Sequence, residues 1–151
     1  MPNWCTNKLT VMGTYEDVRA FRDKAKGQSP WPRQREMEQE DEKPNLLNFH
    51  NFVPVPQEVL VAGYNMAGHL WEMANWGCKW GAYQTRIIEE WDGLVVYQFD
   101  TAWSPPIEFV EKTAKQFPAL TMLLDYEERA MGFKGVAKFK GETKEDHCLT
   151  Y

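Results

Sequence analysis

Cysteine and long apolar runs are scarce in this sequence. Three cysteines, Cys5, Cys78 and Cys148, stand far apart among 151 residues. An odd and widely spaced set predicts no disulfide framework, and a reducing cytoplasm is the expected compartment. No apolar run approaches the ~20 residues of a membrane-spanning helix, and the first residues lack the charged start and apolar stretch of a secretory signal. We therefore expect no membrane partner.

Motifs of catalytic and metal chemistry are scarce as well. The cysteines and histidines show neither Cys-x-x-Cys nor His-x-x-x-His spacing, which metal sites commonly use. A glycine-rich phosphate loop is also absent from the sequence. Lys79 follows Cys78, and a nearby cation lowers the pKa of a thiol, but sequence neighbours establish no geometry. We therefore expect no catalytic residue, no metal and no cofactor, and predict that the protein is not an enzyme.

Positive charge is the minority charge. Lys and Arg number 17 against 22 Asp and Glu, which gives a formal net charge of −5. Binding to a phosphate backbone needs clustered Lys and Arg. Nucleic acid is therefore a possible but not favoured partner, although a local basic face is compatible with the composition.

Aromatic residues, by contrast, are abundant. They make up 14% of the chain and include seven tryptophans. A hydrophobic fraction of 43% with 26% charged residues is typical of a folded soluble domain. The length corresponds to one domain, so we expect a single domain over residues 1–151.

The alternation of apolar residues predicts a β-α-β-β-α-β order with one further strand. Thr14, with Asp17 three positions later, predicts a capped helix start, and Ser104 with Pro105 predicts another. This order indicates an α+β fold, the ferredoxin-like split βαβ arrangement, in which both helices cover one face of an antiparallel sheet. The expected strands span residues 3–12, 82–90, 94–101, 119–127 and 133–140, and the expected helices follow residues 14 and 104.

A long polar or irregular insert, at about residues 28–81, follows the first helix. Residues 46–53 are expected to be extended, because proline disfavours helix in the residue before it and Pro54 and Pro56 follow. Residues 57–73 are predicted to be irregular to helical, since Gly63 and Gly68 weaken any single helix. The sequence does not decide whether the insert covers the other face of the sheet. Its first part is expected to be a solvated loop with a cluster of carboxylates: Glu36, Glu38, Glu40, Asp41 and Glu42.

Polar residues dominate the end of the sequence. The tail, at about residues 141–151, is expected to be frayed.

A glycine-spaced aromatic loop at residues 75–81 is the leading candidate for a binding site. Its glycines permit backbone conformations closed to other residues, and its two indoles are able to form a wall for a planar ligand or a partner side chain. The alternative is that both indoles pin the loop to the sheet and close the core. Trp103, at the junction of a strand and a helix, is expected near the same end of the sheet. The candidate binding residues are Asn75, Trp76, Gly77, Lys79, Trp80 and Trp103.

Four blocks of the sequence resemble the YubB-like family of plasmid and bacteriophage proteins. They are Met-Pro-Asn-Trp-Cys-Thr-Asn at residues 1–7, Val-Pro-Val-Pro at 53–56, Asn-Trp-Gly-Cys-Lys-Trp at 75–80 and Thr-Ala-Trp-Ser-Pro-Pro at 101–106. The resemblance implies a ferredoxin-like fold and a mobile-element origin, and it implies no enzymatic activity. Cys78 stands where the family has Thr, and Gly81 where Asp is usual, so chemistry at those two side chains is not expected.

These observations favour a non-enzymatic interaction or accessory protein that contacts a host or mobile-element protein in the bacterial cytoplasm. An aromatic anchor beside charged residues is typical of a compact protein interface. A variant of this hypothesis has the acidic insert imitate nucleic acid. The alternative is binding of single-stranded nucleic acid through the open sheet face, with Lys8, Lys134 and Lys138 as a basic strip. The oligomeric state does not follow from the sequence.

Overall fold

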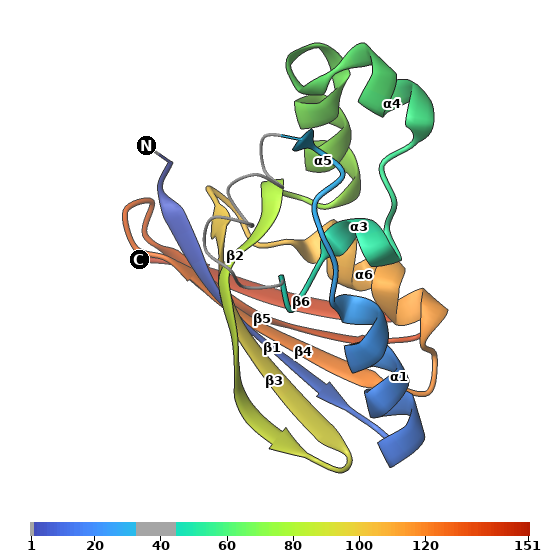
Figure 1. Cartoon of the computed structure of the whole chain (residues 1–151). Helices are drawn as coiled ribbons and strands as arrows, with labels where there is room; N and C mark the ends of the chain where they lie inside the picture. The colour runs from blue at the N-terminus through green and yellow to red at the C-terminus, as the bar shows by residue number, and fades with distance from the viewer. Residues whose placement is uncertain (1, 33–44) are drawn as a thin grey trace.

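One antiparallel sheet forms the centre of the molecule. The structure, a computed structural model, describes residues 2–32 and 45–151. The strands within these ranges form a single six-stranded sheet in the order β2-β3-β1-β4-β5-β6, shown in Figure 1. Their bounds are β1 Trp4–Met12, β2 Lys79–Trp91, β3 Leu94–Ala102, β4 Thr121–Glu128, β5 Phe133–Lys140 and β6 Thr143–Thr150.

Two helices cover one face of this sheet in the order that the sequence predicts. Helix α1 spans Tyr15–Ala25 and α6 spans Ile107–Gln116. The strand order β2-β3-β1-β4, with these crossovers, is that of a ferredoxin-like fold, which confirms the predicted α+β class. Strands β5 and β6 extend the sheet beyond β4. We call the face opposite α1 and α6 the open face.

The two predicted helix caps have different outcomes. Thr14 caps α1, because its Oγ1 accepts a hydrogen bond from the Asp17 backbone N–H at 3.2 Å. Ser104, however, does not cap α6: the helix begins at Ile107, and its first turn has no side-chain cap. The Ser104 hydroxyl instead donates to the Gly77 carbonyl at 2.6 Å. Tertiary contact with the loop at the end of the insert therefore replaces the local cap.

Short helices occupy the described part of the chain between α1 and β2. They are α3 Phe49–Phe52, α4 Gln57–Ala62, the π-helical turn η1 Tyr64–Gly68 and α5 His69–Asn75. The prediction of an extended segment at 46–53 is wrong, because Asn48 caps α3 by accepting from the Asn51 N–H at 3.2 Å. Pro54 constrains only Val53, where the helix has already ended.

The prediction of a frayed tail is also wrong. Strand β6 pairs with β5 along its whole length, and the Tyr126 hydroxyl donates to Asp146 Oδ1 at 2.7 Å. All eight β6 residues are exposed, because β6 is an edge strand with solvent on both faces. Its polar composition reflects that exposure and not a lack of regular structure.

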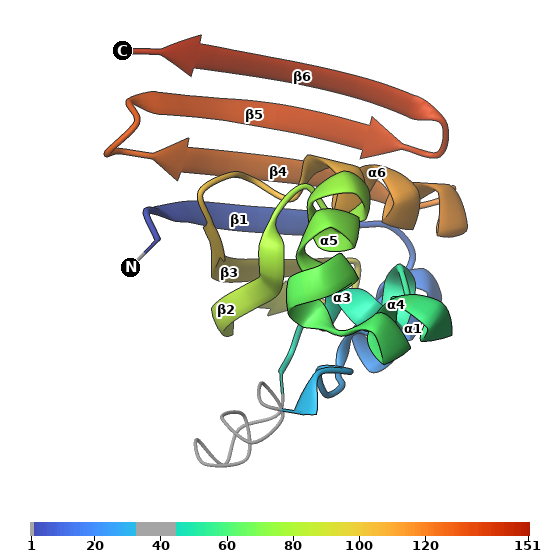
Figure 2. The same cartoon turned by 90° about the horizontal axis from the view of Figure 1, so that it is seen from above.

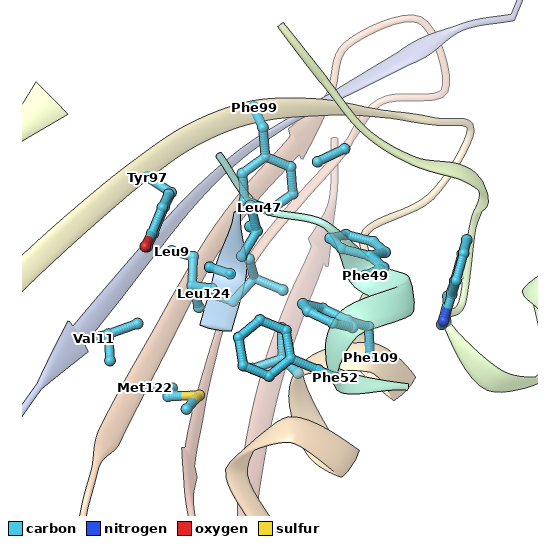
Figure 3. Packing of buried hydrophobic residues seen from close by; sticks show 14 of the residues in the cluster. Leu9, Val11, Leu47, Phe49, Phe52, Tyr97, Phe99, Phe109, Met122 and Leu124 are labelled. Atoms are coloured by element: carbon cyan, nitrogen blue, oxygen red, sulfur yellow. The ribbon is translucent and has the colours of Figure 1, made fainter. Parts of the chain in front are cut away.

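Aromatic packing joins the insert to the helical side of the sheet. The rings of Phe49 and Phe109 stack with centroids 3.8 Å apart, and Phe21 stacks on Phe52 at 4.8 Å. Figure 3 shows Phe49, Phe52 and Phe109 grouped beside Leu9 and Leu124. In Figures 1 and 2, α3, α4 and α5 lie on the same side of the sheet as α1 and α6. The described part of the insert therefore leaves the open face uncovered.

No helix within residues 2–32 and 45–151 combines the length and the apolar character that crossing a membrane would need.

Candidate functional site

Trp76, the central residue of the predicted binding loop, is a core residue. Its side chain is only 3% exposed, and its indole N–H donates to the Val53 carbonyl at 2.9 Å. The ring meets Phe49 and Trp71 edge-on, with centroids 5.6 and 5.7 Å away. Trp76 therefore pins the end of the insert to the core, as the structural interpretation of this loop expects, and offers no surface to a partner.

Asn75 and Gly77 shape the loop around this tryptophan. The Asn75 amide donates to the Trp71 carbonyl at 2.9 Å and accepts from the Lys112 ammonium. Gly77 has φ +83°, and a Cβ there would lie 2.0 Å from Glu108 Oε2. Both positions thus serve the join between α5 and α6. The positive φ of Gly77 favours glycine there, and a Cβ would displace the Glu108 carboxylate.

Trp80 takes a left-handed backbone conformation beside a buried carboxyl. Its φ is +70°, which is costly for a bulky side chain. Its backbone N–H donates to Glu72 Oε1 at 2.7 Å, and the Trp31 indole donates to Glu72 Oε2 at 3.1 Å. Burial raises the pKa of the fully buried Glu72 to about 7, although these hydrogen bonds act in the opposite direction. Sequence reasoning missed Glu72, because its partners come from distant segments.

Aromatic rings gather at one end of the open face. Trp4 and Tyr83 lie with ring centroids 5.1 Å apart, and Trp80 lies 6.3 Å from Tyr83. Lys79 belongs to the same end, since Lys79 and Trp4 both pair with Ala102 of the intervening strand. The structure therefore brings Lys79 and Trp80 together with Trp4, which is not among the candidate residues that the sequence suggests.

Trp103 lies at the strand–helix junction of the same end. It is 45% exposed and has φ +69°. Its backbone N–H donates to the Asn3 carbonyl at 2.8 Å, which ties the junction to the start of β1. Trp103 therefore lies near the end of the sheet where the sequence places it, but it shares no surface with Trp76, which is enclosed in the core.

A hollow of about 1200 Å³ lies on the open face, over β1, β4, β5 and β6. Lys8 and Asp125 form an ion pair across it at 4.0 Å, with both side chains about half exposed. Lys134 lies opposite Glu127 in the sheet register, and Lys138 lies opposite Glu145. The three lysines share this face, as expected, but carboxylates alternate with them, so they do not form a continuous basic strip.

The outer surface of the insert has a different character. Met66, Leu70 and Met73 lie at i, i+4 and i+7 along the continuous helical segment of η1 and α5, and all three are exposed. We call them the outer stripe. Val61 on the neighbouring α4 is also exposed. Within residues 57–75 the carboxylates are Glu58 and the buried Glu72, so the helical segment that bears the stripe itself carries little charge.

Sequence analysis predicted the helical tendency of this segment but missed the stripe. Its spacing was the available signal, because residues three and four apart share one face of a helix. Figure 1 shows α4 and α5 standing beyond one end of the sheet. The stripe is therefore on a projecting part of the molecule.

The two buried cysteines, Cys5 and Cys78, are poorly suited to nucleophilic chemistry. Burial raises the pKa of Cys5 to about 12 and that of Cys78 well above its ordinary range. Lys79 therefore does not activate Cys78. In the described ranges, no three side chains of His, Cys, Asp and Glu come together as a metal site would require.

Comparison with known proteins supports the fold. Residues 79–150 match the model of a family described as the ferredoxin-like domain in Api92-like protein. The crystal structure of protein Api92 from Yersinia pseudotuberculosis superposes on the chain with a TM-score of 0.74 at 11% sequence identity, covering 100% of this chain and 98% of that one. No curated protein matches the sequence. The chain thus shares the fold of Api92 over its whole length, and residues 79–150 are similar to the ferredoxin-like domain of Api92-like proteins.

Proposed function

We propose that the protein is a non-enzymatic interaction protein of a phage or plasmid, and that it binds a partner protein in the bacterial host through the outer stripe. The mobile-element origin rests on the sequence blocks that resemble the YubB-like family. The binding surface rests on one observation: Met66, Leu70 and Met73 form an exposed apolar line on a projecting helix.

Exposure of such a line has an energetic cost that folding does not repay. Each fully exposed large apolar side chain forgoes roughly 1.5–3 kcal/mol of burial free energy, and a row of them on a monomer marks an interaction surface. Single exposed apolar residues need no such explanation. The contiguity of the stripe, and not its hydrophobicity alone, therefore supports the proposal.

The stripe indicates the chemistry of the partner. A helix that presents residues i, i+4 and i+7 fits a hydrophobic groove on another protein. Methionine side chains are flexible and polarizable, so two of them suit a surface that adapts to the groove. Because the surrounding segment carries little charge, we expect an apolar groove with few charged residues at its floor. The acidic cluster at Glu36–Glu42, proposed as a second contact or a nucleic-acid mimic, lies outside the described residues.

Binding of single-stranded nucleic acid through the open face is less well supported. Base stacking on Trp4, Tyr83 and Trp80 is sterically reasonable for such a surface. However, Asp125 and Glu127 stand among the lysines of that face and would repel a phosphate backbone.

Affinity capture from bacterial host lysate with matched variants tests the proposal. Leu70 and Leu149 are 64% and 67% exposed, but Leu70 lies in the outer stripe and Leu149 on the open face. We expect the partner to be retained by wild type and by Leu149→Ser, and to be lost by Leu70→Ser. Equal recovery with Leu70→Ser, or recovery of nucleic acid that depends on Lys134, would refute the outer stripe as the binding surface.

A further inference from the structure

We propose that Glu72 is a proton-controlled latch, which holds the insert against the sheet while its carboxyl is protonated and loosens the insert when it ionises. A role of this latch in regulating partner binding rests on the proposed function. The pH-dependent attachment of the insert itself is independent of that function.

The Glu72 carboxyl joins three segments that are distant in sequence. It projects from α5, accepts the Trp31 indole N–H at 3.1 Å and accepts the Trp80 backbone N–H at 2.7 Å. Trp31 stands before the insert helices, and Trp80 stands in β2. The Trp31 ring also meets Tyr64 edge-on at 5.3 Å and packs on Gly68, where a Cβ would lie 2.6 Å from Cζ2. One carboxyl therefore fastens α5 to the sheet and to the segment that follows α1.

The latch and the outer stripe belong to the same helix. Glu72 is completely buried, whereas its neighbour Met73 and Leu70 two residues earlier are exposed. A rigid helix couples its two sides, so any displacement of α5 from Trp80 also displaces the stripe. The left-handed backbone of Trp80 is held in part by the Glu72 hydrogen bond, and release of that bond would allow the start of β2 to relax.

No cation is found among the groups that interact most strongly with this carboxyl in the described structure. Burial is the main influence on its pKa, and the Trp80 and Trp31 hydrogen bonds only partly oppose it. Burial raises the pKa of Tyr64 and of Cys78, and the Glu72 carboxylate raises both further. The titratable and charged groups on the elements packed around this end of α5 are His69 on α5 itself, Tyr64 on η1, Cys78 before β2, Lys79 and Tyr83 at the start of β2, and Glu108, Glu111, Lys112 and Lys115 on α6.

The direction of the effect follows from linkage. Burial raises the pKa of Glu72 from 4.5 to about 7 in the closed arrangement, and a hydrated carboxyl in the opened arrangement returns to its ordinary value. The closed arrangement therefore holds the proton more tightly. The free-energy preference for the closed arrangement that this proton supplies is complete below pH 4.5, falls between pH 4.5 and 7, and stays low at higher pH.

Amide hydrogen exchange of the intact protein tests the latch. After correction for intrinsic rates, we expect the opening constant of residues 69–75 to rise up to about tenfold per pH unit from pH 5 to 7 and then to level off. These amides should also exchange faster than those of β1, because the insert opens without unfolding the sheet. Glu72→Gln should abolish the pH dependence, while Glu58→Gln, at an exposed position on α4, should leave it unchanged.

A second variant keeps the test decisive if Glu72→Gln does not fold. Trp31→Phe removes one hydrogen bond to the ionised carboxyl, so the midpoint of the titration should move to higher pH. A pH-independent opening in wild type, the same pH dependence in Glu72→Gln, an unmoved midpoint in Trp31→Phe, or common exchange of α5 and β1 would overturn the proposal. Because exchange is measured without a partner, failure of the outer stripe as a binding surface would leave the outcome unaffected.

Discussion

The outer stripe and the open face expose apolar side chains to a similar degree but in different surroundings. Leu70 and Leu149 are about equally exposed. Leu70 lies in line with Met66 and Met73, whereas Leu149 lies opposite Lys134 in the sheet and borders a hollow that also contains Asp125 and Glu127. The comparison teaches that the exposed fraction of one residue does not separate the two surfaces; what sets the outer stripe apart is that its exposed residues follow one another on a single helix face, without the charged residues that stand among Leu149 and Val136 on the open face.

The largest expected effect concerns the attachment of the insert. Trp76→Ala removes an indole that is nearly enclosed by Phe49, Trp71 and the Val53 carbonyl, and we expect it to lower the free energy of unfolding by about 3–5 kcal/mol. Denaturant unfolding measures this loss. Trp91→Ala, at an exposed hairpin position, is the control and should cost far less. Similar losses for both variants would contradict the core position of Trp76.

The second expected effect is the pH dependence of stability. The pKa of Glu72 is higher in the folded protein, so its contribution to the free energy of unfolding should fall by about 3 kcal/mol as pH rises from 4.5 to 7. Denaturant unfolding of wild type and Glu72→Gln at several pH values isolates this contribution, since other carboxylates titrate in both. Parallel curves for the two proteins would show that Glu72 ionises normally.

A smaller effect on stability is expected on both surfaces of the comparison. Leu70→Ser and Leu149→Ser should each change the free energy of unfolding by no more than about 0.5 kcal/mol, because neither side chain is buried. Thermal unfolding provides the measurement. A large loss for Leu70→Ser would mean that the stripe stabilises the fold, and its effect on partner binding would then have a structural cause.

The smallest effect is expected from the charges of the open face. Lys8→Ala removes a half-exposed ion pair with Asp125 at 4.0 Å, which is worth about 0–1 kcal/mol and is screened by salt. The free energy of unfolding of Lys8→Ala should be nearly that of the wild type. Gel shifts of the wild-type protein with single-stranded nucleic acid should show no salt-sensitive complex. A complex that disappears in Lys8→Ala would make the open face the functional surface.

Local patterns of the sequence were sufficient for much of the fold. The alternation in residues 3–12 predicted β1, whose Leu9 and Val11 face the core, and Thr14 predicted the start of α1. Strand β6 was missed because an edge strand with both faces in solvent has no apolar alternation. Helix α3 was missed because Asn48 starts the helix and the helix ends at Phe52, before Pro54 constrains the backbone.

The site was harder to predict, because its geometry is tertiary. The aromatic residues marked the loop at 75–80 as a candidate binding site. Only the fold shows that Trp76 points into the core while Trp80 lies beside Tyr83. In the sequence, nothing distinguishes Glu72 from a surface carboxylate of a helix. In the fold it is buried and accepts hydrogen bonds from Trp31 and Trp80. Long-range contacts, which no local pattern encodes, thus decide which residues are available to a partner.

Site-specific photo-crosslinking in a bacterial host tests the central claim most directly. A photoreactive amino acid placed at position 70 or at position 149 reports contacts of the outer stripe and of the open face in otherwise identical proteins. We predict a discrete protein crosslink from position 70 that is absent from position 149. A crosslink of equal strength from both positions, one from position 149 alone, or none from position 70 would contradict the outer stripe as the partner-binding surface.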